Sequence, residues 1–181
     1  MDAKDLFEYY GWLDGNGNYT VEGLKALSLL IDKLPRIHEG MWRDVFIPYM
    51  SKAVNVSAEI AIIREDVASG KRQILLTMRD DQYYGKGWHI PGGFIGPGET
   101  RQETVERIAG REIRIKPTFR QIIKPFFHDD DPRFPHVAIV FECSYDGQEE
   151  VSAGKWFDSM PDNIIKAHEK YRVAVGELLR R

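Results

Sequence analysis

The stretch that most constrains this 181-residue chain is a glycine-rich loop followed directly by an acidic helical segment. Residues 92–98 contain four glycines, and a helix-like run extends from about Thr100 to Ile113. The glycines let backbone amides and carbonyls approach a ligand closely. Acidic residues on the helix can offer carboxylates to a hard cation such as magnesium, which prefers oxygen ligands. A unit of this kind is suited to binding a diphosphate.

The glycines and charged residues of this unit have the spacing of a known motif. Gly93 is followed after five residues by Glu99, and seven further residues lead to Arg107. Glu112 and Ile115 stand at the next intervals. The stretch therefore resembles the Nudix signature, which implies an α/β fold, a Nudix α/β/α sandwich with a mixed sheet. We expect Glu99 to bond Arg107 and so lock the loop onto the helix, and Arg107 is also a candidate substrate contact.

Three positions of the signature carry other residues. Ile108 and Arg111 stand where the family has glutamates, and Arg114 stands where it has a glycine. Of the three carboxylates that usually hold the metals, only Glu112 remains. This pattern resembles the GDP-mannose mannosyl hydrolase branch, which keeps only the last glutamate of the helix and also lines up with residues 75–93 without a gap.

The resemblance implies one magnesium ion, with manganese as an alternative, bound by Glu112, the Gly93 carbonyl and Glu150. Glu150 falls at the position of a family metal ligand when the strand around Trp156 is aligned with the family. One ion would suffice if water attacks the anomeric carbon, because the metal then only has to stabilise charge growing on the departing diphosphate. From the residues alone, Glu112 could instead pair with Lys116, four positions along the helix.

Candidate substrate contacts lie on both sides of a strand expected around residues 88–90. Arg79 falls on a family arginine, which implies a contact with the diphosphate, because a guanidinium matches paired phosphate oxygens. By steadying the leaving group, Arg79 would also take part in catalysis, and a surface pair with Asp80 or Asp81 is the alternative. Tyr83 and Phe94 are candidates for stacking on the base, or they pack in the core.

The histidine base of the resembled branch has no counterpart here, because Val151 stands at its position. Another residue must then activate the attacking water. The loop between the strands expected at residues 119–127 and 136–143 is dense in histidine and aspartate. We therefore take His128, Asp130 and His136 as the candidate catalytic residues. A solvated acidic loop without a catalytic role is the alternative.

The chain is predicted to form one main domain with helical ends. Residues 53–160 make up the Nudix domain. Ahead of it, residues 1–52 form a helical extension in which Thr20 caps an amphipathic helix through residues 21–34, and a homodimer is expected to form through this extension. Residues 161–181 form a C-terminal helix packed on the domain.

Composition narrows the classes of function. The net charge is -3 and no basic run stands out, so binding to nucleic acid or to a membrane is not expected. Cys143 is the single cysteine, which leaves no intrachain disulfide and favours a reducing compartment, so we expect a cytoplasmic protein. No run of residues approaches a membrane span.

These features predict magnesium-dependent hydrolysis of a nucleoside diphosphate sugar, similar to GDP-mannose, to the free sugar and the nucleoside diphosphate. A second hypothesis keeps attack at phosphorus, with Glu103, Glu106 or Glu150 as substitute ligands. A third is a Nudix-fold module that binds nucleotides without turnover.

Overall fold

The computed structural model describes residues 9–14, 18, 20–26, 55–148 and 150–181. The chain divides into two compact units, Met1–Gly40 and Met41–Arg181. In the first unit, residues 21–26 are helical, and the Thr20 hydroxyl accepts a hydrogen bond from the Gly23 amide at 3.0 Å, as expected for a cap. The predicted continuation of this helix lies outside the described residues.

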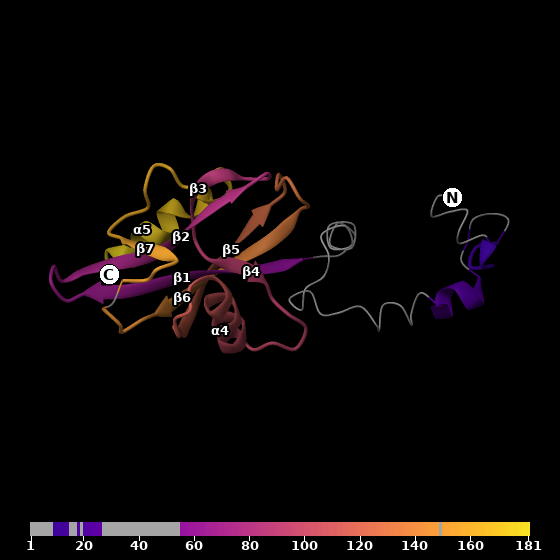
Figure 1. Ribbon diagram of the computed structural model, residues 1–181, viewed down its shortest axis with the longest axis horizontal. Helices are drawn as coiled ribbons and strands as arrows, with labels where there is room; N and C mark the ends of the chain where they lie inside the picture. The colour runs from indigo at the N-terminus through magenta and orange to yellow at the C-terminus, as the bar shows by residue number, and fades with distance from the viewer. Residues whose placement is uncertain (1–8, 15–17, 19, 27–54, 149) are drawn as a thin grey trace. The chain divides into compact units, whose positions relative to one another are not determined.

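The second unit is built on a seven-stranded mixed sheet (Figure 1). Its main path runs β3-β2-β1-β6-β5, while β4 pairs with β1 and β7 pairs with β2. The β1–β6 pair is parallel and the other pairs are antiparallel. The strands are β1 (Val56–Asp66), β2 (Lys71–Asp81), β3 (Gly85–His89), β4 (Gly92–Phe94), β5 (Thr118–His128), β6 (His136–Ser144) and β7 (Gly154–Phe157).

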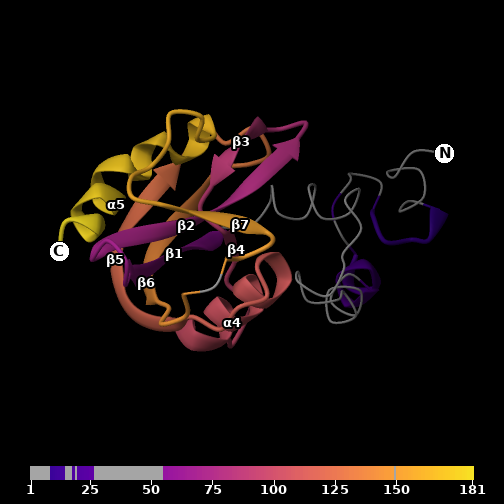
Figure 2. The same ribbon diagram turned by 60° about the vertical axis from the view of Figure 1, so that its left-hand side comes forward.

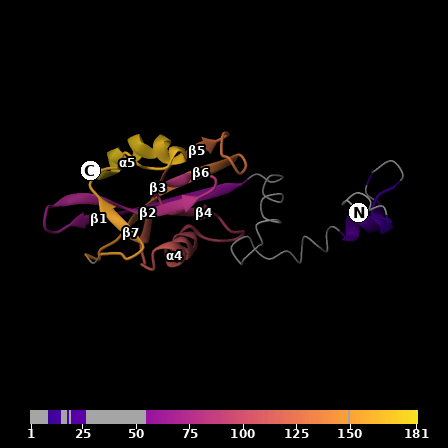
Figure 3. The same ribbon diagram turned by 45° about the horizontal axis from the view of Figure 1, so that its top comes forward.

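Helices cover both faces of this sheet (Figures 2 and 3). Helix α4 (Arg101–Glu112) packs on one face, while the 3-10 helix η1 (Lys166–Tyr171) and helix α5 (Arg172–Leu179) pack on the other. The predicted α/β/α sandwich and C-terminal helix are therefore confirmed. Among the described helices, none is long and apolar enough to cross a membrane.

Strand β1 is apolar on both sides because both sides are covered. Ala58, Ile60 and Ile62 pack in the cluster beneath α4, and Ala61 and Ile63 pack in the cluster beneath η1 and α5. This alternation follows from the two-residue period of a strand, and its nearly continuous hydrophobic run is typical of a strand buried between two layers.

The start of α4 is held by a capping box. The Thr100 hydroxyl accepts from the Glu103 amide at 3.2 Å, and the Glu103 carboxylate accepts from the Thr100 amide at 2.8 Å. Ile108 is fully buried against the sheet. An apolar residue at this signature position therefore contributes to the core, where the family has a carboxylate.

The start of the glycine stretch differs from the predicted loop, because Gly92–Phe94 form the short strand β4. In its register with β1, Glu59 faces Gly92 and Ala58 faces Gly93. Since glycine has no side chain, the two backbones and the Glu59 side chain can approach closely at this point. The pairing brings the middle of β1 into the site.

Candidate functional site

The end of α4 and the glycine stretch meet at one guanidinium. Nη2 of Arg111 donates to the Gly92 carbonyl oxygen at 2.9 Å and to Oε1 of Glu112 at 2.5 Å. A Cβ atom on Gly93 would lie 3.2 Å from the same nitrogen. Two oxygens, one from the backbone and one from a carboxylate, therefore converge on a single cationic atom.

The second carboxylate oxygen of Glu112 lacks a donor. Oε2 is buried and has no hydrogen-bond partner among the residues that the structure describes, and Nε2 of His89 lies 3.7 Å away. Nδ1 of the same ring lies 3.0 Å from the Thr77 carbonyl oxygen, so His89 connects Glu112 to strand β2. Burial favours protonation of Glu112, but His89 and Arg111 outweigh it and lower the pKa of this carboxyl.

A further carboxylate, Glu59, lies beside the same loop, and sequence analysis did not identify it. Glu59 is 7% exposed, and a Cβ on Gly92 would lie 2.1 Å from its Oε2, so a side chain at position 92 would displace this carboxylate. Burial, followed by the negative charge of Glu112, raises the pKa of Glu59 to about 8. The sequence feature that could have identified Glu59 is its position as an acidic residue inside an otherwise apolar stretch of strand.

His168 joins this group from the far end of the chain. Its Nδ1 accepts a hydrogen bond from the Ile90 amide at 3.1 Å, so the ring proton is on Nε2, which lies 3.8 Å from Oε2 of Glu59. Burial is the main reason that the pKa of His168 is well below its usual value. The carboxylates beside the loop are thus contacted by two histidines, His89 and His168.

Two arginines stack on one tyrosine ring near these carboxylates. The guanidinium carbons of Arg79 and Arg133 lie 4.4 Å and 5.0 Å from the centre of the Tyr84 ring. Nε of Arg79 binds Asp81 at 2.5 Å, so the surface pair left open by the sequence does form. Nε of Arg133 binds Asp131 at 3.2 Å. Hydrogen bonds from the outer nitrogens of either arginine are absent within the described part of the chain, so these nitrogens remain available to a ligand.

The three candidate catalytic residues of the predicted loop differ in burial and in their contacts. The rings of His128 and His136 stack with centres 4.6 Å apart, and both are buried. Burial lowers both pKa values, that of His128 to about 4, so the rings are neutral. Asp130 is 86% exposed in its side chain and pairs with Lys170 at 3.7 Å. Its neighbour Asp131, instead, makes the buried contacts.

His128, Asp131 and His136 present possible metal-binding atoms within 4.8 Å of one another. However, Oδ2 of Asp131 accepts from the Tyr84 hydroxyl at 2.5 Å, and Oδ1 accepts from the Arg133 backbone at 3.0 Å. Because these bonds already satisfy the carboxylate, the cluster is better described as a hydrogen-bonded network that supports the loop.

Glu99 and Arg107 connect the loop to the helix. Arg107 donates to both carboxylate oxygens of Glu99, at 2.5 Å and 2.7 Å, and to the Phe94 carbonyl oxygen at 2.7 Å. Arg107 is the main cause that lowers the pKa of Glu99 to about 2. With its nitrogens bonded in this way, Arg107 has a structural role in the loop, whereas its predicted substrate contact stays a prediction.

Phe94 and Tyr83, the two candidates for stacking on the base, both contact other residues of the domain. The Phe94 ring packs 5.5 Å from the Phe134 ring and 5.8 Å from His136. The Tyr83 amide donates to Asp81 at 2.9 Å.

Glu150 is exposed, and the hydrogen bonds of nearby Gln148 run to Arg64, Glu65 and Val67 at the end of β1 remote from Glu59. These contacts do not link Glu150 to Glu112.

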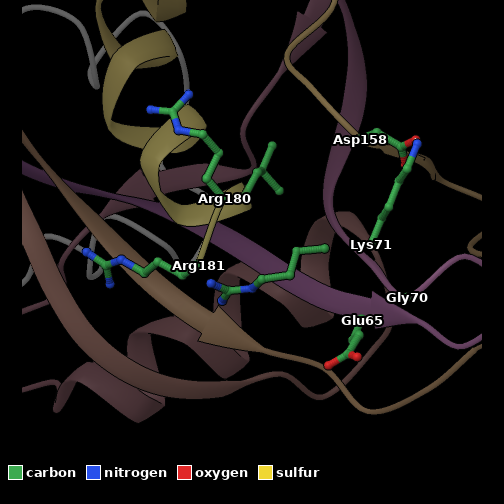
Figure 4. A pocket seen from close by; sticks show the side chains of 8 residues that line it. Glu65, Gly70, Lys71, Asp158, Arg180 and Arg181 are labelled. Carbon is green, nitrogen blue, oxygen red and sulfur yellow. The ribbon is translucent and has the colours of Figure 1, made fainter.

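A separate pocket of about 420 Å³ lies near the β1–β2 turn and the end of α5 (Figure 4). Its cations are mostly paired: Arg72 binds Glu142 at 3.0 Å, and Lys71 binds Asp158 at 3.6 Å. It also lies at the opposite end of β1 from Glu59. The site beside the glycine stretch is therefore the stronger functional candidate.

Comparisons with known proteins agree with this fold. The Nudix domain of Shewanella oneidensis NrtR, solved with ADP ribose, is 20% identical and superposes with a TM-score of 0.57 over 77% of this chain and 99% of that one. A *Francisella tularensis* bifunctional NMN adenylyltransferase/ADP ribose pyrophosphatase, solved with AMP and a manganese ion, is also 20% identical, with a TM-score of 0.57 over 76% of this chain and 45% of that one.

A MutT protein from Methanosarcina mazei Go1 is 17% identical and has a TM-score of 0.54 over 71% of this chain and 96% of that one. The search among curated proteins gave no match. The model of the NUDIX domain matches residues 56–175, about two thirds of the chain. Since that match spans the glycine stretch, α4 and every strand of the sheet, the chain belongs to the Nudix hydrolase family.

Proposed function

We propose that this protein hydrolyses a nucleoside diphosphate sugar, similar to GDP-mannose, by attack of water at the anomeric carbon. The observation that carries the proposal is the meeting of the Gly92 carbonyl and Glu112 on one cationic atom, in a signature helix that lacks the other usual carboxylates. Such a site suits a single cation that stabilises a departing diphosphate.

The residues present fit one divalent cation, magnesium or manganese. The Gly92 carbonyl oxygen and Oε1 of Glu112 both reach one point, and Oε2 of Glu112 is buried without a donor among the described residues. Glu112 and the backbone at Gly92 and Gly93 would hold the ion, which usually keeps several waters as well. When bound, it would supply positive charge to the leaving diphosphate.

Arg79 and Arg133 provide the second part of the diphosphate site. Their Nε atoms are held by Asp81 and Asp131, and the Tyr84 ring lies beside both guanidiniums. A guanidinium held at one edge presents its remaining N–H groups in a fixed direction, which suits paired phosphate oxygens. These arginines would orient the diphosphate.

His136 is the best-placed general base of the three candidates. Its Nδ1 faces the Phe134 carbonyl oxygen at 3.3 Å and so carries the proton, which leaves the Nε2 lone pair available to accept a proton from water. His128 is less suitable because its Nε2 already bonds the Tyr171 hydroxyl at 2.5 Å. Asp130 is exposed to solvent and is ion-paired.

Two further points support this class of substrate. ADP ribose, which is bound in the related NrtR structure, also joins a nucleoside diphosphate to a sugar, although through C5 of the sugar and not through the anomeric carbon. In addition, attack at carbon does not require the metal to activate the water, so a site with few carboxylates can still support it. The expected products are a free sugar and a nucleoside diphosphate.

The test is hydrolysis of a panel of nucleotide sugars such as GDP-mannose in oxygen-18 water with magnesium or manganese, with ADP ribose, whose diphosphate is not on the anomeric carbon, as the comparison substrate. Label in the free sugar supports attack at carbon, and label only in phosphate products overturns it in favour of attack at phosphorus. Absence of product with every divalent metal, together with nucleotide-dependent thermal stabilisation, would identify a binding module.

A pair of variants tests the role of Glu112 in this reaction. Glu112→Gln should lower kcat/KM by about 100-fold or more, because a preorganised charge at the leaving group is lost. Lys116→Gln is the matched control and should leave kcat/KM within about twofold. Equal effects of both changes would mean that Glu112 contributes no more to the reaction than an exposed charge just beyond the end of α4.

A further inference from the structure

Arg111 is the residue of the signature helix that the proposed reaction does not use. It stands where the resembled signature has a glutamate, so this position changes from a negative to a positive charge. Its guanidinium does not extend into solvent alone: one of its nitrogens bonds both oxygens assigned to the cation site. The signature position that normally attracts a metal here supplies a cation of its own.

The geometry makes this arginine and a metal ion alternatives. Magnesium binds oxygen at about 2.0–2.1 Å, whereas Nη2 of Arg111 lies 2.9 Å from the Gly92 oxygen and 2.5 Å from Oε1 of Glu112. An ion that contacts both oxygens would overlap this nitrogen, and the two positive charges would repel each other. The guanidinium also lies over Gly93, where a Cβ would be 3.2 Å from Nη2.

Arg111 can leave this position when another cation takes its place. Its side chain is 52% exposed, while that of Glu112 is only 19% exposed. An ion pair with one exposed partner is weakened by solvent, and a long side chain at the end of a helix can turn outward. Glu112 cannot follow it as easily, so departure of Arg111 leaves a poorly solvated carboxylate that needs another cation.

We propose that Arg111 is a resident cation: it fills the metal position of the metal-free protein, and a divalent ion binds only when its guanidinium moves away. This inference rests on the cation site of the proposed function, but it does not depend on the substrate or the reaction. It assigns a role to a signature position that would otherwise count only as a lost ligand.

Binding of Mn²⁺ alone, measured by the electron paramagnetic resonance signal of the free ion, tests this role without substrate. We expect Arg111→Gln to bind one Mn²⁺ at least about tenfold more tightly than the wild-type protein, because the competitor is removed while both oxygens remain. Arg114→Gln is the matched control: it makes the same charge change three residues later, at an exposed side chain for which the described residues provide no ion-pair partner. Its affinity should stay within about twofold of wild type.

Two further measurements separate the possible results. Without metal, Arg111→Gln should melt at a lower temperature than wild type, and saturating Mn²⁺ should remove the difference. Adding Glu112→Gln to Arg111→Gln should abolish the tight binding. Equal Mn²⁺ affinity of wild type and Arg111→Gln, both dependent on Glu112, would overturn the resident cation and leave the proposed cation site intact. Absence of Glu112-dependent binding in every variant would overturn both.

Discussion

Glu59 and Glu112 are two carboxylates beside the same glycine stretch, and their pKa values shift in opposite directions. Glu112 has His89 and Arg111 as neighbours, which together outweigh burial and keep it ionised. Glu59 is more deeply buried and faces the charge of Glu112, so its pKa rises to about 8. The difference follows from the local partners of each group.

Glu59 makes the stability of the metal-free protein depend on pH. A carboxyl whose pKa is higher in the folded than in the unfolded state destabilises the fold as pH rises from about 4.5 to about 8, because the unfolded chain releases its proton first. Glu59→Gln removes this loss, so at pH 8 it should be more stable than wild type by on the order of 3 kcal/mol. Near pH 4 the two proteins should be equal.

Urea unfolding at several pH values with a chelator present measures this effect. Glu106→Gln is the control, because Glu106 is exposed on α4 and undergoes the same chemical change. If Glu59→Gln were instead the less stable protein at pH 8, Glu59 would have to be ionised and paired in the folded state.

At the scale of the element, helix α4 ends in a conformation that favours glycine. Arg114 has φ 64°, and its amide donates to the Ala109 carbonyl oxygen at 2.7 Å, closing the last turn. The left-handed region is unfavourable for residues with a Cβ atom. This explains why the resembled signature has a glycine at this position.

Arg114→Gly should therefore stabilise the protein by about 1 kcal/mol, because it relieves the strained backbone. Arg114→Ala removes the same charge but keeps the Cβ, so it should not stabilise. Thermal or urea unfolding of the three proteins distinguishes the backbone effect from the charge effect, and equal stabilisation by alanine and glycine would disprove the conformational explanation.

At the scale of the whole second unit, the C-terminal segment completes the core and the site. Tyr171, Val175 and Leu178 are buried against the sheet, and His168 contacts Glu59. The family match also extends to residue 175, beyond the boundary at 160 that we predicted for the domain. The segment is therefore part of the hydrophobic core of this unit.

Leu178→Ala should lower the free energy of unfolding by about 2–4 kcal/mol, because it opens a cavity in a buried cluster. Leu178 is 1% exposed, whereas Val173 on the same helix is 67% exposed and provides the control. Val173→Ala should change stability by less than about 0.5 kcal/mol. Similar urea midpoints for both variants would mean that α5 does not stabilise the sheet.

The residues that sequence analysis found share one property: their interactions are local. The Glu99–Arg107 pair depends only on the spacing within one loop and one helix, and so does the Thr100 capping box that the structure added. The alternation along β1 likewise reports burial on both faces. These local patterns agree with the sandwich that the resemblance to the Nudix signature implied.

The partners of that stretch were decided by tertiary structure. Pairing of β4 with β1 sets Glu59 against Gly92, and packing of η1 brings His168 to the same place from more than 100 residues away in sequence. The conformation of one loop buries Asp131 and exposes Asp130, although the two are adjacent. The sequence by itself determined the fold class and the locked loop, because neighbouring residues specify caps, turns and periodicity. Only the folded chain decided which charges meet at the site, because strand register and layer packing join residues that no local pattern connects.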